Sequence, residues 1–555
     1  MLKFTSLLAV IGCVLSSPVS ATEVGRPNIL FILVDDLGYA DLGCQGSTEI
    51  RTPHIDGLAA SGLRFTDAYV TAPQCGPSRA GIMTGVHQAR FGYGDNNNNH
   101  GLPDPHILPL MPEYLKQAGY RTGFVGKWHL GQGTEAMLSK TERDEYRKVR
   151  KKEALPKQRV EAAKPWKRGF DEGLFFVGGG GHYFPFRERH ANNPSSNYFT
   201  FNRPDRQPER YKRGANAFKT DFLTDAAIEF IRSENKKPWF LYLSYTAPHT
   251  PLQAKQKDIA ANKHIKDPKR RIFAGMMTCL DHNVGRVLKH LDEQGLRENT
   301  LIVCLSDNGG PTGPNTSRND PFSGVKGDVY EGGIRVPMIA SWPGKLAKGE
   351  VVSDPVISLD LLPTFTAVAG RQAKHPLLEG KNLLPWLTGK TECPNDELFW
   401  SWRETFNAVR MGTLKEIRNG KPVEAVDGTA IPAHNFVDLA TNPRELAGEY
   451  ALKDEDKKKR LSTALDAWLS SVKEDAGKLT PSTELEKSDP KGTATLSAER
   501  VYQKEEFDPS GRDHSLAMAQ ALARCREEGT QVLVLPRKTC PSQRHTLKHI
   551  NKERE

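Results

Sequence analysis

Short apolar runs alternate with longer amphipathic segments from about residue 26 to residue 390. The apolar runs are rich in β-branched residues and bounded by Gly or Pro, which predicts buried strands at 28–34, 121–126, 239–244, 300–306 and 335–341. Apolar positions spaced by three or four residues predict helices at 54–61, 78–86, 111–118, 219–233 and 271–293. The alternation favours an α/β fold with a mostly parallel sheet and helices on both faces.

The pattern changes after about residue 390. Residues 397–420 read as short antiparallel strands, and 454–472 as an amphipathic helix. Together they predict a smaller C-terminal antiparallel sheet with a helix. Residues 176–216 combine Gly, Asn, Pro and Arg with aromatic residues, which predicts a long functional loop. The polar tail after residue 472 is poor in apolar residues up to 513, and then a helix and the run QVLVLP are expected.

The N-terminus reads as an export signal. Residues 1–21 hold Lys3, an apolar stretch from Leu7 to Leu15 and the small residues Val19-Ser20-Ala21 as a cleavage site. We therefore expect a secreted or periplasmic protein. The minority alternative is a lipoprotein with its lipid on Cys13, because Val10-Ile11-Gly12-Cys13 resembles a lipobox. No later run reaches 18 apolar residues, so no membrane span is expected.

Composition and charge narrow the class further. The chain has 555 residues, 37% apolar and 26% charged, as for a globular protein of more than one domain. The net charge of +10 is uneven, because Lys140 to Arg168 holds 12 Lys or Arg and 5 Asp or Glu. This segment is either a solvated helix or a positively charged surface beside the site that attracts a polyanionic substrate. Nucleic acid is excluded by the absence of a recognition motif and by export.

The cysteines do not form a dense disulfide framework. Eight are scattered along the chain. Cys525 and Cys540 are candidates for a disulfide in an exported protein, and their spacing does not decide it.

Oxygen-bearing side chains follow two of the predicted strands. Asp35 and Asp36 follow the first, and Asp307 and Asn308 follow the strand at 300–306. The carboxyl edge of a parallel sheet is where open α/β folds build their sites. A single Asp pair is as often a turn or cap, but two matched pairs indicate a site for a hard cation such as Ca²⁺ or Mg²⁺.

The segment PQCGPSRAGIMTG places Cys75 at the start of the helix predicted at 78–86. Pro77 suits the first turn of a helix, and free N–H groups there favour an anion. The alternative is a buried structural cysteine beside a turn.

Cys75-x-Pro77-Ser78-Arg79 followed by Thr84-Gly85 resembles the segment from which formylglycine-dependent sulfatases make their catalytic aldehyde. Three more segments match that family in order: GYRTGFVGKWHLGQG with Lys127 and His129, YTAPHTP with His249, and FSGVKGDVYEGGIRVP with Lys326. The chain is therefore identified as similar to the arylsulfatase-type sulfatases of the alkaline phosphatase-like superfamily. The resemblance covers about residues 26 to 470.

The resemblance implies a domain plan. After the signal peptide at 1–21, it implies a catalytic sulfatase α/β domain at 22–390 and a small C-terminal α+β domain at 391–472. Residues 473–555 are left as a linker and tail of unknown role.

The resemblance also implies the chemistry. Cys75 would be oxidised to Cα-formylglycine by a formylglycine-generating enzyme, and it would complete a Ca²⁺ site, with Mg²⁺ as the alternative, formed by Asp35, Asp36, Asp307 and Asn308. One hydroxyl of the aldehyde hydrate would attack sulfur. Arg79 and Lys127 would hold the hydrate, and Lys326 would grip the sulfate. His249 would protonate the leaving oxygen, and His129 would take the proton of the second hydroxyl.

The function expected from this resemblance is a secreted sulfatase, a sulfuric ester hydrolase. Its substrate would be a sulfated polysaccharide or oligosaccharide, or a small aryl sulfate. A phosphatase or phosphonate hydrolase of the same superfamily is one alternative, because fold does not fix function. A catalytically silent protein that binds sulfated glycans is the other. Its signature would be a missing nucleophile or ligand, and the sequence lacks none of them.

Overall fold

A computed structural model describes most of the chain. The described residues are 26–96, 102–103, 105, 107–130, 163–176, 178–184, 198–204, 206–212, 217–232, 237–425, 427–479, 493–497 and 532–536. The predicted signal segment with Cys13, residues 131–162 of the basic region, Cys525 and Cys540 lie outside them. The predictions made for those residues, and the predicted domain boundaries, stay predictions.

The largest element is a ten-stranded sheet with the strand order β11-β2-β10-β9-β1-β8-β4-β5-β6-β7. In that order the strands are Glu350–Val352, Leu63–Phe65, Met338–Ser341, Thr300–Ser306, Asn28–Asp35, Trp239–Pro248, Arg121–Lys127, Glu172–Phe176, Tyr198–Arg203 and Arg206–Lys212. The five central strands, from β9 to β5, are parallel. β10, β6 and β7 run antiparallel to their neighbours. The sheet confirms the predicted mostly parallel α/β fold.

Alternate residues of β1 point to opposite faces of the sheet, as in any strand. Ile29, Phe31 and Leu33 join one buried cluster, whereas Leu30, Ile32 and Val34 join another. Because both faces of this strand are buried, its sequence is a continuous apolar run rather than an alternating one. Burying each such side chain fully contributes about 1.5–3 kcal/mol.

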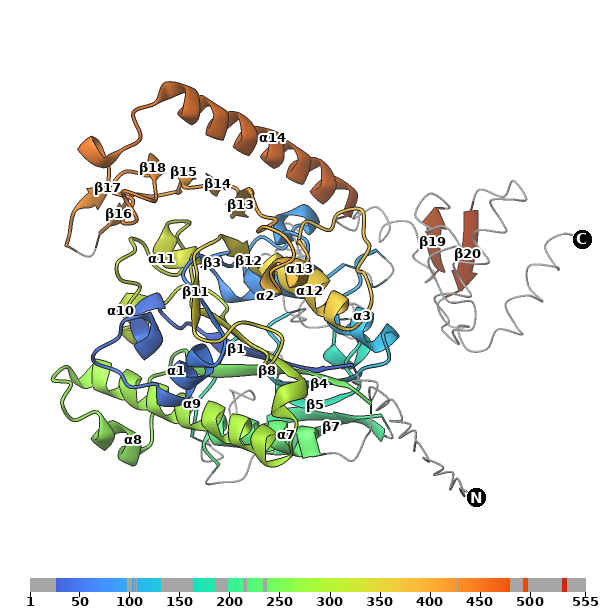
Figure 1. The fold of residues 1–555 in the computed structure, drawn as a ribbon. Helices are drawn as coiled ribbons and strands as arrows, with labels where there is room; N and C mark the ends of the chain where they lie inside the picture. The colour runs from blue at the N-terminus through green and yellow to red at the C-terminus, as the bar shows by residue number, and fades with distance from the viewer. Residues whose placement is uncertain are drawn as a thin grey trace, which may run out of the picture.

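Two groups of helices cover the two faces (Figure 1). One face carries α1 (Pro53–Ala60), α7 (Lys219–Arg232), α8 (Gln256–Ala261) and α9 (Pro268–Glu293). The other carries α2 (Cys75–Thr84), α3 (Met111–Gln117), α12 (Leu361–Val368) and α13 (Leu384–Leu387). The five predicted helices correspond to α1, α2, α3, α7 and α9. Within the described part of the chain, none of the helices combines the length and apolar character needed to cross a bilayer.

Two predictions in this region need correction. The strand expected at 335–341 begins only at Met338, because Arg335, directly after the short helix α11 (Glu331–Ile334), makes an isolated antiparallel bridge with Tyr69 instead. The long loop expected at 176–216 contains the hairpin of β6 and β7, which extends the sheet. There Phe201 lies opposite Leu174 of β5, so its aromatic side chain serves sheet packing. Gly- and Pro-rich composition had hidden that pairing.

A second sheet follows in the chain and is antiparallel throughout, as predicted. Its strands are β13 (Glu397–Trp402), β14 (Phe406–Met411), β15 (Leu414–Arg418) and β18 (His434–Asp438). One face packs through Leu398 and Trp400 against residues near Tyr330. The opposite face is covered by α14 (Glu455–Leu479), which runs beyond the helix end expected at 472 (Figure 1).

The remaining elements are short. They are α10 (Thr312–Asn315), α11 (Glu331–Ile334), and the strand pairs β3 with β12 (Ala68–Tyr69, Val356–Ile357), β16 with β17 (Val423–Glu424, Ala430–Ile431) and β19 with β20 (Thr493–Ser497, Val532–Pro536). The apolar run QVLVLP of the tail is thus largely strand β20.

A buried ion cluster joins the small sheet to the large domain. Lys415 of β15 places its Nζ 2.7 Å from Glu331 Oε1 and 2.7 Å from Glu445 Oε1, and all three side chains are fully buried. Burial raises the pKa of Glu445, whereas Lys415, Arg335 and Arg410 hold the pKa of Glu331 below its usual value against the effect of burial. Lys415 is the cation that the two buried carboxylates share, and Glu331 also pairs with Arg335 at 3.1 Å.

We expect Lys415→Met to destabilise the protein by about 3–5 kcal/mol, because it leaves two carboxylates buried without their shared cation. A thermal unfolding scan should show a midpoint several degrees lower. Lys415→Met combined with Glu445→Gln should recover part of the loss.

The matched control is Lys421→Met. Lys421 is 61% exposed and its Nζ lies 3.5 Å from Asp328, so removing its charge should change stability by less than about 1 kcal/mol. If the two lysine substitutions lowered stability equally, the buried cluster would contribute no more than an exposed ion pair.

Candidate active site

The polar residues predicted after two strands do meet at one edge of the sheet. β1 and β9 are adjacent and in register, with Val34 opposite Ser306. Asp36 follows β1 with a left-handed φ of 65°. Its backbone N–H donates to Asp307 Oδ1 at 3.2 Å, and Asn308 Nδ2 donates to Asp36 Oδ1 at 2.7 Å. The two strand ends therefore form one cluster of oxygen-bearing side chains.

Cys75 is the first residue of α2, directly after the N-cap Gln74. The predicted helix thus begins at the cysteine itself, with Pro77 in its first turn. The side chain is 1% exposed, and burial raises the pKa of its thiol to about 11 although Lys127 and Lys326 oppose this. An unmodified Cys75 is therefore protonated at neutral pH and is a weak nucleophile.

Two predicted lysines reach this cluster from different elements. Lys326 Nζ lies 3.0 Å from Cys75 Sγ and 2.5 Å from Asp36 Oδ1. Burial disfavours its charge, but Asp36 and Cys75 hold the pKa of Lys326 well above its usual value. Lys127, at the end of β4, places its Nζ 2.7 Å from Asp35 Oδ2. Lys326 thus contacts both the Cys75 sulfur and a carboxylate, whereas Lys127 contacts the carboxylate of Asp35.

Arg79 lies one turn along α2 and is completely buried. Its Nε donates to Asp307 Oδ2 at 2.9 Å, and its Nη1 donates to the backbone oxygen of Lys127 at 2.9 Å and to Ser244 Oγ at 2.7 Å. These contacts attach the guanidinium to the acidic cluster rather than to the Cys75 sulfur. The sequence prediction missed Ser244, whose only signal was its position near the carboxyl end of a central strand.

Of the two predicted histidines, His129 is buried and His249 is partly buried. The Nδ1–H of His249 donates to the Thr250 backbone oxygen at 2.6 Å, which leaves Nε2 facing Asp36 Oδ2 at 3.6 Å. Burial lowers the pKa of His249, and it lowers that of His129 far below its usual value, with Lys127 adding to the effect. His129 is therefore neutral at neutral pH.

A run of glycines packs directly on these histidines. A Cβ added to Gly179 would lie 2.7 Å from His129 Nε2, and one added to Gly180 would lie 3.3 Å from His249 Cε1. Both distances are shorter than ordinary carbon contacts. Gly179 and Gly180 therefore allow a close approach to the two histidines, a role the sequence prediction did not assign to them.

The donor atoms fit a divalent cation. Single ligand atoms of Asp35, Asp36, Cys75 and His249 lie within 4.8 Å of one another. Among the described residues, Asp35 Oδ1 and Asn308 Oδ1 are buried without a hydrogen-bond partner. Burial and the nearby charge of Asp35 raise the pKa of Asp307 to about 7. A bound cation would satisfy the two oxygens and relieve the repulsion between these carboxylates.

The predicted ligand set and that group share Asp35, Asp36 and Cys75. Asp307 lies outside the group, and both of its carboxylate oxygens accept hydrogen bonds, from Arg79 and from the Asp36 backbone. His249 lies inside it. The ligand roles predicted for Asp35, Asp36, Cys75, Asp307 and Asn308 stay predictions.

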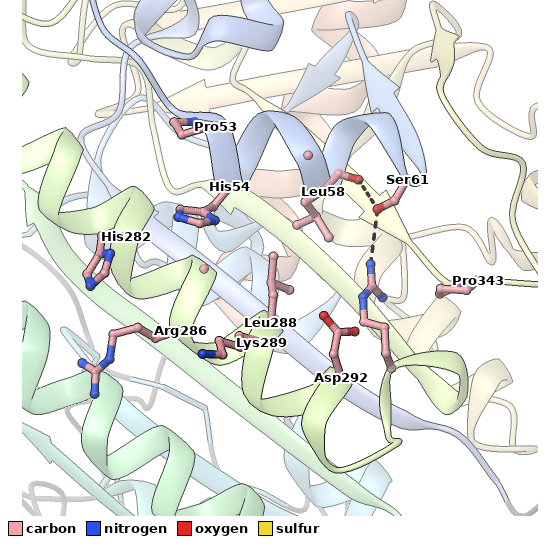
Figure 2. Close-up of a pocket in the computed structure, with 13 residues that line it drawn as sticks. Pro53, His54, Leu58, Ser61, His282, Arg286, Leu288, Lys289, Asp292 and Pro343 are labelled. Carbon is pink, nitrogen blue, oxygen red and sulfur yellow. Dashed lines mark hydrogen bonds between the residues drawn. The ribbon is translucent and has the colours of Figure 1, made fainter.

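A separate groove of about 550 Å³ lies between α1 and α9 (Figure 2). It includes none of the predicted site residues. Two of its cations are already paired with neighbouring carboxylates, Arg286 with Asp225 and Lys289 with Glu293. The buried charges of the predicted site lie around Cys75 instead.

Comparisons with known proteins agree with this geometry. The family profile described as Sulfatase matches residues 27–371, and that of the N-sulphoglucosamine sulphohydrolase C-terminal region matches 325–475. Human arylsulfatase A is 34% identical over 429 residues, which are 73% of this chain and 78% of that protein. Mouse N-acetylgalactosamine-6-sulfatase is 30% identical over 407 residues, 70% of this chain and 71% of that protein.

A solved structure shows the same fold. The crystal structure of Ps i-CgsB in complex with k-i-k-neocarrahexaose is 32% identical and superposes with a TM-score of 0.66. The match covers 82% of this chain and 94% of that one.

We expect Gly179→Ala to lower kcat for a small aryl sulfate roughly 10- to 100-fold, because the added methyl displaces the His129 ring. The thermal unfolding midpoint should stay close to that of the wild type, since the change is local.

Gly313→Ala is the matched control, because nothing lies within 4 Å of a Cβ at that position. Gly179→Ala with full activity would contradict the close packing of this loop on His129.

Proposed function

The chain belongs to the sulfatase family of sulfuric ester hydrolases, and we propose that its substrate is a sulfated polysaccharide or oligosaccharide. The observation that carries this is Cys75, held at a helix N-terminus beside Lys326, among carboxylates that fit a cation. Two similar proteins support the proposal of a carbohydrate substrate. One is named for N-acetylgalactosamine, and the other was solved with a neocarrahexaose.

The proposed nucleophile is a formylglycine made from Cys75. A formylglycine-generating enzyme would catalyse the two-electron oxidation of the Cys75 CH2–SH group by an external oxidant such as dioxygen, and hydrolysis would then replace the sulfur by a carbonyl oxygen and release it as sulfide. The hydrated aldehyde offers two hydroxyls. One attacks sulfur and releases the alcohol, and the other then loses its proton so that the hemiacetal sulfate collapses to aldehyde and sulfate. The elevated thiol pKa supports this, because the cysteine itself is poorly suited to attack.

The positions of four side chains support the roles that we propose for them. His249 presents Nε2 to the site and would donate a proton to the leaving oxygen. Neutral, buried His129 would accept the proton of the second hydroxyl. Lys326, at the reacting atom, would bind the sulfate oxygens, and Lys127 would offset the charge that develops on them.

The proposed metal is Ca²⁺, with Mg²⁺ as the alternative, held by Asp35, Asp36, Asp307, Asn308 and the modified Cys75. A set dominated by carboxylate and amide oxygens suits a hard cation. When bound, the ion would polarise the sulfate oxygens and the attacking hydroxyl. Arg79 would keep Asp307 oriented, because its guanidinium lies 2.9 Å from that carboxylate.

We also propose that the protein is exported. The support is the signal-like segment at residues 1–21, which lies outside the described residues. Cleavage after Ala21 would leave Thr22 as the first residue. A lipid on Cys13 remains the alternative proposal.

The function is tested by sulfate release from a panel of defined sulfated sugars, an aryl sulfate and the matched aryl phosphate. We expect turnover of at least one sugar and a clear preference for sulfate over phosphate. Dialysis against a chelator should abolish turnover, and Ca²⁺ should restore it. Cys75→Ala should be folded and inactive. A phosphate preference, or activity that survives chelation, would contradict the corresponding part of the proposal.

The maturation is tested by mass spectrometry of active protein. The tryptic peptide Phe65 to Arg79 should be lighter than its thiol form by roughly 18 Da. The N-terminal peptide should begin at Thr22. A fully active preparation with only the thiol peptide would rule out the formylglycine, and an acylated Cys13 would replace Ala21 as the cleavage site.

A further inference from the structure

The hairpin between β13 and β14 reaches the rim of the site from the small sheet. Trp400 Nε1 donates to the Val70 backbone oxygen at 2.8 Å, and Gln88 Nε2 donates to that of Ser401 at 3.3 Å. These bonds fix β13 against the segments before and after α2, the helix that begins at Cys75. The tip of the hairpin, residues 403–405, is exposed.

The tip has an unfavourable backbone conformation. Arg403 and Glu404 have φ values of 50° and 60°, a left-handed region that residues with a Cβ avoid. The bend is held by Asn407, whose Nδ2 donates to the Glu404 backbone oxygen at 2.7 Å. Backbone strain of this kind gathers at binding and catalytic sites, so the tip is a candidate for such a role.

The Arg403 side chain is held at one end and open at the other. Its Nε donates to Asp95 Oδ2 at 2.9 Å, and its guanidinium lies 4.4 Å from the centre of the Trp402 ring. Within the described part of the chain, Nη1 and Nη2 have no hydrogen-bond or ion-pair partner, and the side chain is 44% exposed. The result is an oriented fork of two free donors, the geometry that binds carboxylates and sulfates bidentately.

Two short chains of contacts connect this fork to the reacting atoms. Asp95 is followed by Asn96, whose Oδ1 accepts from the backbone N–H of Gly76 at 2.9 Å. Trp402 lies 3.8 Å from a Cβ built on Gly327, the residue after Lys326. Short chains of contacts therefore connect Arg403 to the residues that follow Cys75 and Lys326.

We propose that Arg403 is a specificity-determining residue that binds a second anionic group of the substrate, a sulfate or a carboxylate, next to the ester that is cleaved. This rests on the proposed carbohydrate substrate. It implies that a sugar with one sulfate and no other charge is a poorer substrate than one with a neighbouring anion. An aryl sulfate offers no such group.

The experiment compares Arg403→Ala and Arg403→Lys with wild type on four substrates. Three are oligosaccharides with the same cleaved ester and a neighbouring unit that carries a sulfate, a carboxylate or no charge, and the fourth is an aryl sulfate. Arg403→Ala should raise KM roughly 10- to 100-fold on the substrate whose second anion is bound, with a far smaller change on the other substrates. The charged substrate whose KM rises more shows whether the bound anion is a sulfate or a carboxylate. The KM of Arg403→Lys on that substrate should lie between those of wild type and Arg403→Ala, because lysine keeps the charge but lacks the paired Nη donors.

Arg286→Ala is the matched control, since Arg286 is 34% exposed, pairs with Asp225 and lies in the groove of Figure 2. It should leave all four KM values unchanged. Equal losses on every substrate with Arg403→Ala would overturn the proposal in favour of a structural role through Asp95, and no loss on any substrate would also overturn it. Wild-type protein that cleaves the aryl sulfate and no sulfated sugar would instead overturn the proposed function, before any variant is tested.

Discussion

The site depends on mutual neutralisation of charges that are completely buried. Asp35, Asp307, Arg79 and Lys127 have no solvent exposure, and each lies against an opposite charge. An isolated charge in such a place would cost several kcal/mol, and removing one member leaves its partner unpaired. The positions of the strand ends and of α2 must therefore be kept closely. The low-dielectric surroundings also strengthen every interaction with an incoming anion.

The architecture supplies these charges from separate parts of the chain. Adjacent parallel strands bring Asp35 and Asp307 to one edge, and α2 then places Cys75 and Arg79 opposite them. The small C-terminal sheet contributes residues to this arrangement as well. One of its strands carries Lys415 into the buried cluster with Glu331, and another ends at the hairpin beside Asp95. The second sheet thus both braces the site and borders it.

The sequence predicted the features that depend on local pattern. The apolar runs before Asp35 and Asp307 indicated buried parallel strands, and register then brings their ends together. Pro77 and the segment after it indicated a helix that begins near Cys75. Contacts between segments that are far apart in the sequence could not be predicted, because they produce no periodic pattern. The approach of Gly179 to His129, the contact of Arg403 with Asp95 and the antiparallel pairing of β10 are set by packing, and composition hid the β6–β7 hairpin.

The burial of Cys75 has a consequence for how the protein is made. A side chain that is 1% exposed, at the start of a helix enclosed by other elements, cannot enter the active site of a second enzyme. The proposed oxidation must therefore act on the nascent or unfolded chain. Folding and modification then compete in time, and a molecule that folds first stays inactive for its lifetime. The active fraction of a preparation would be fixed during synthesis, and later exposure to the modifying enzyme would not raise it.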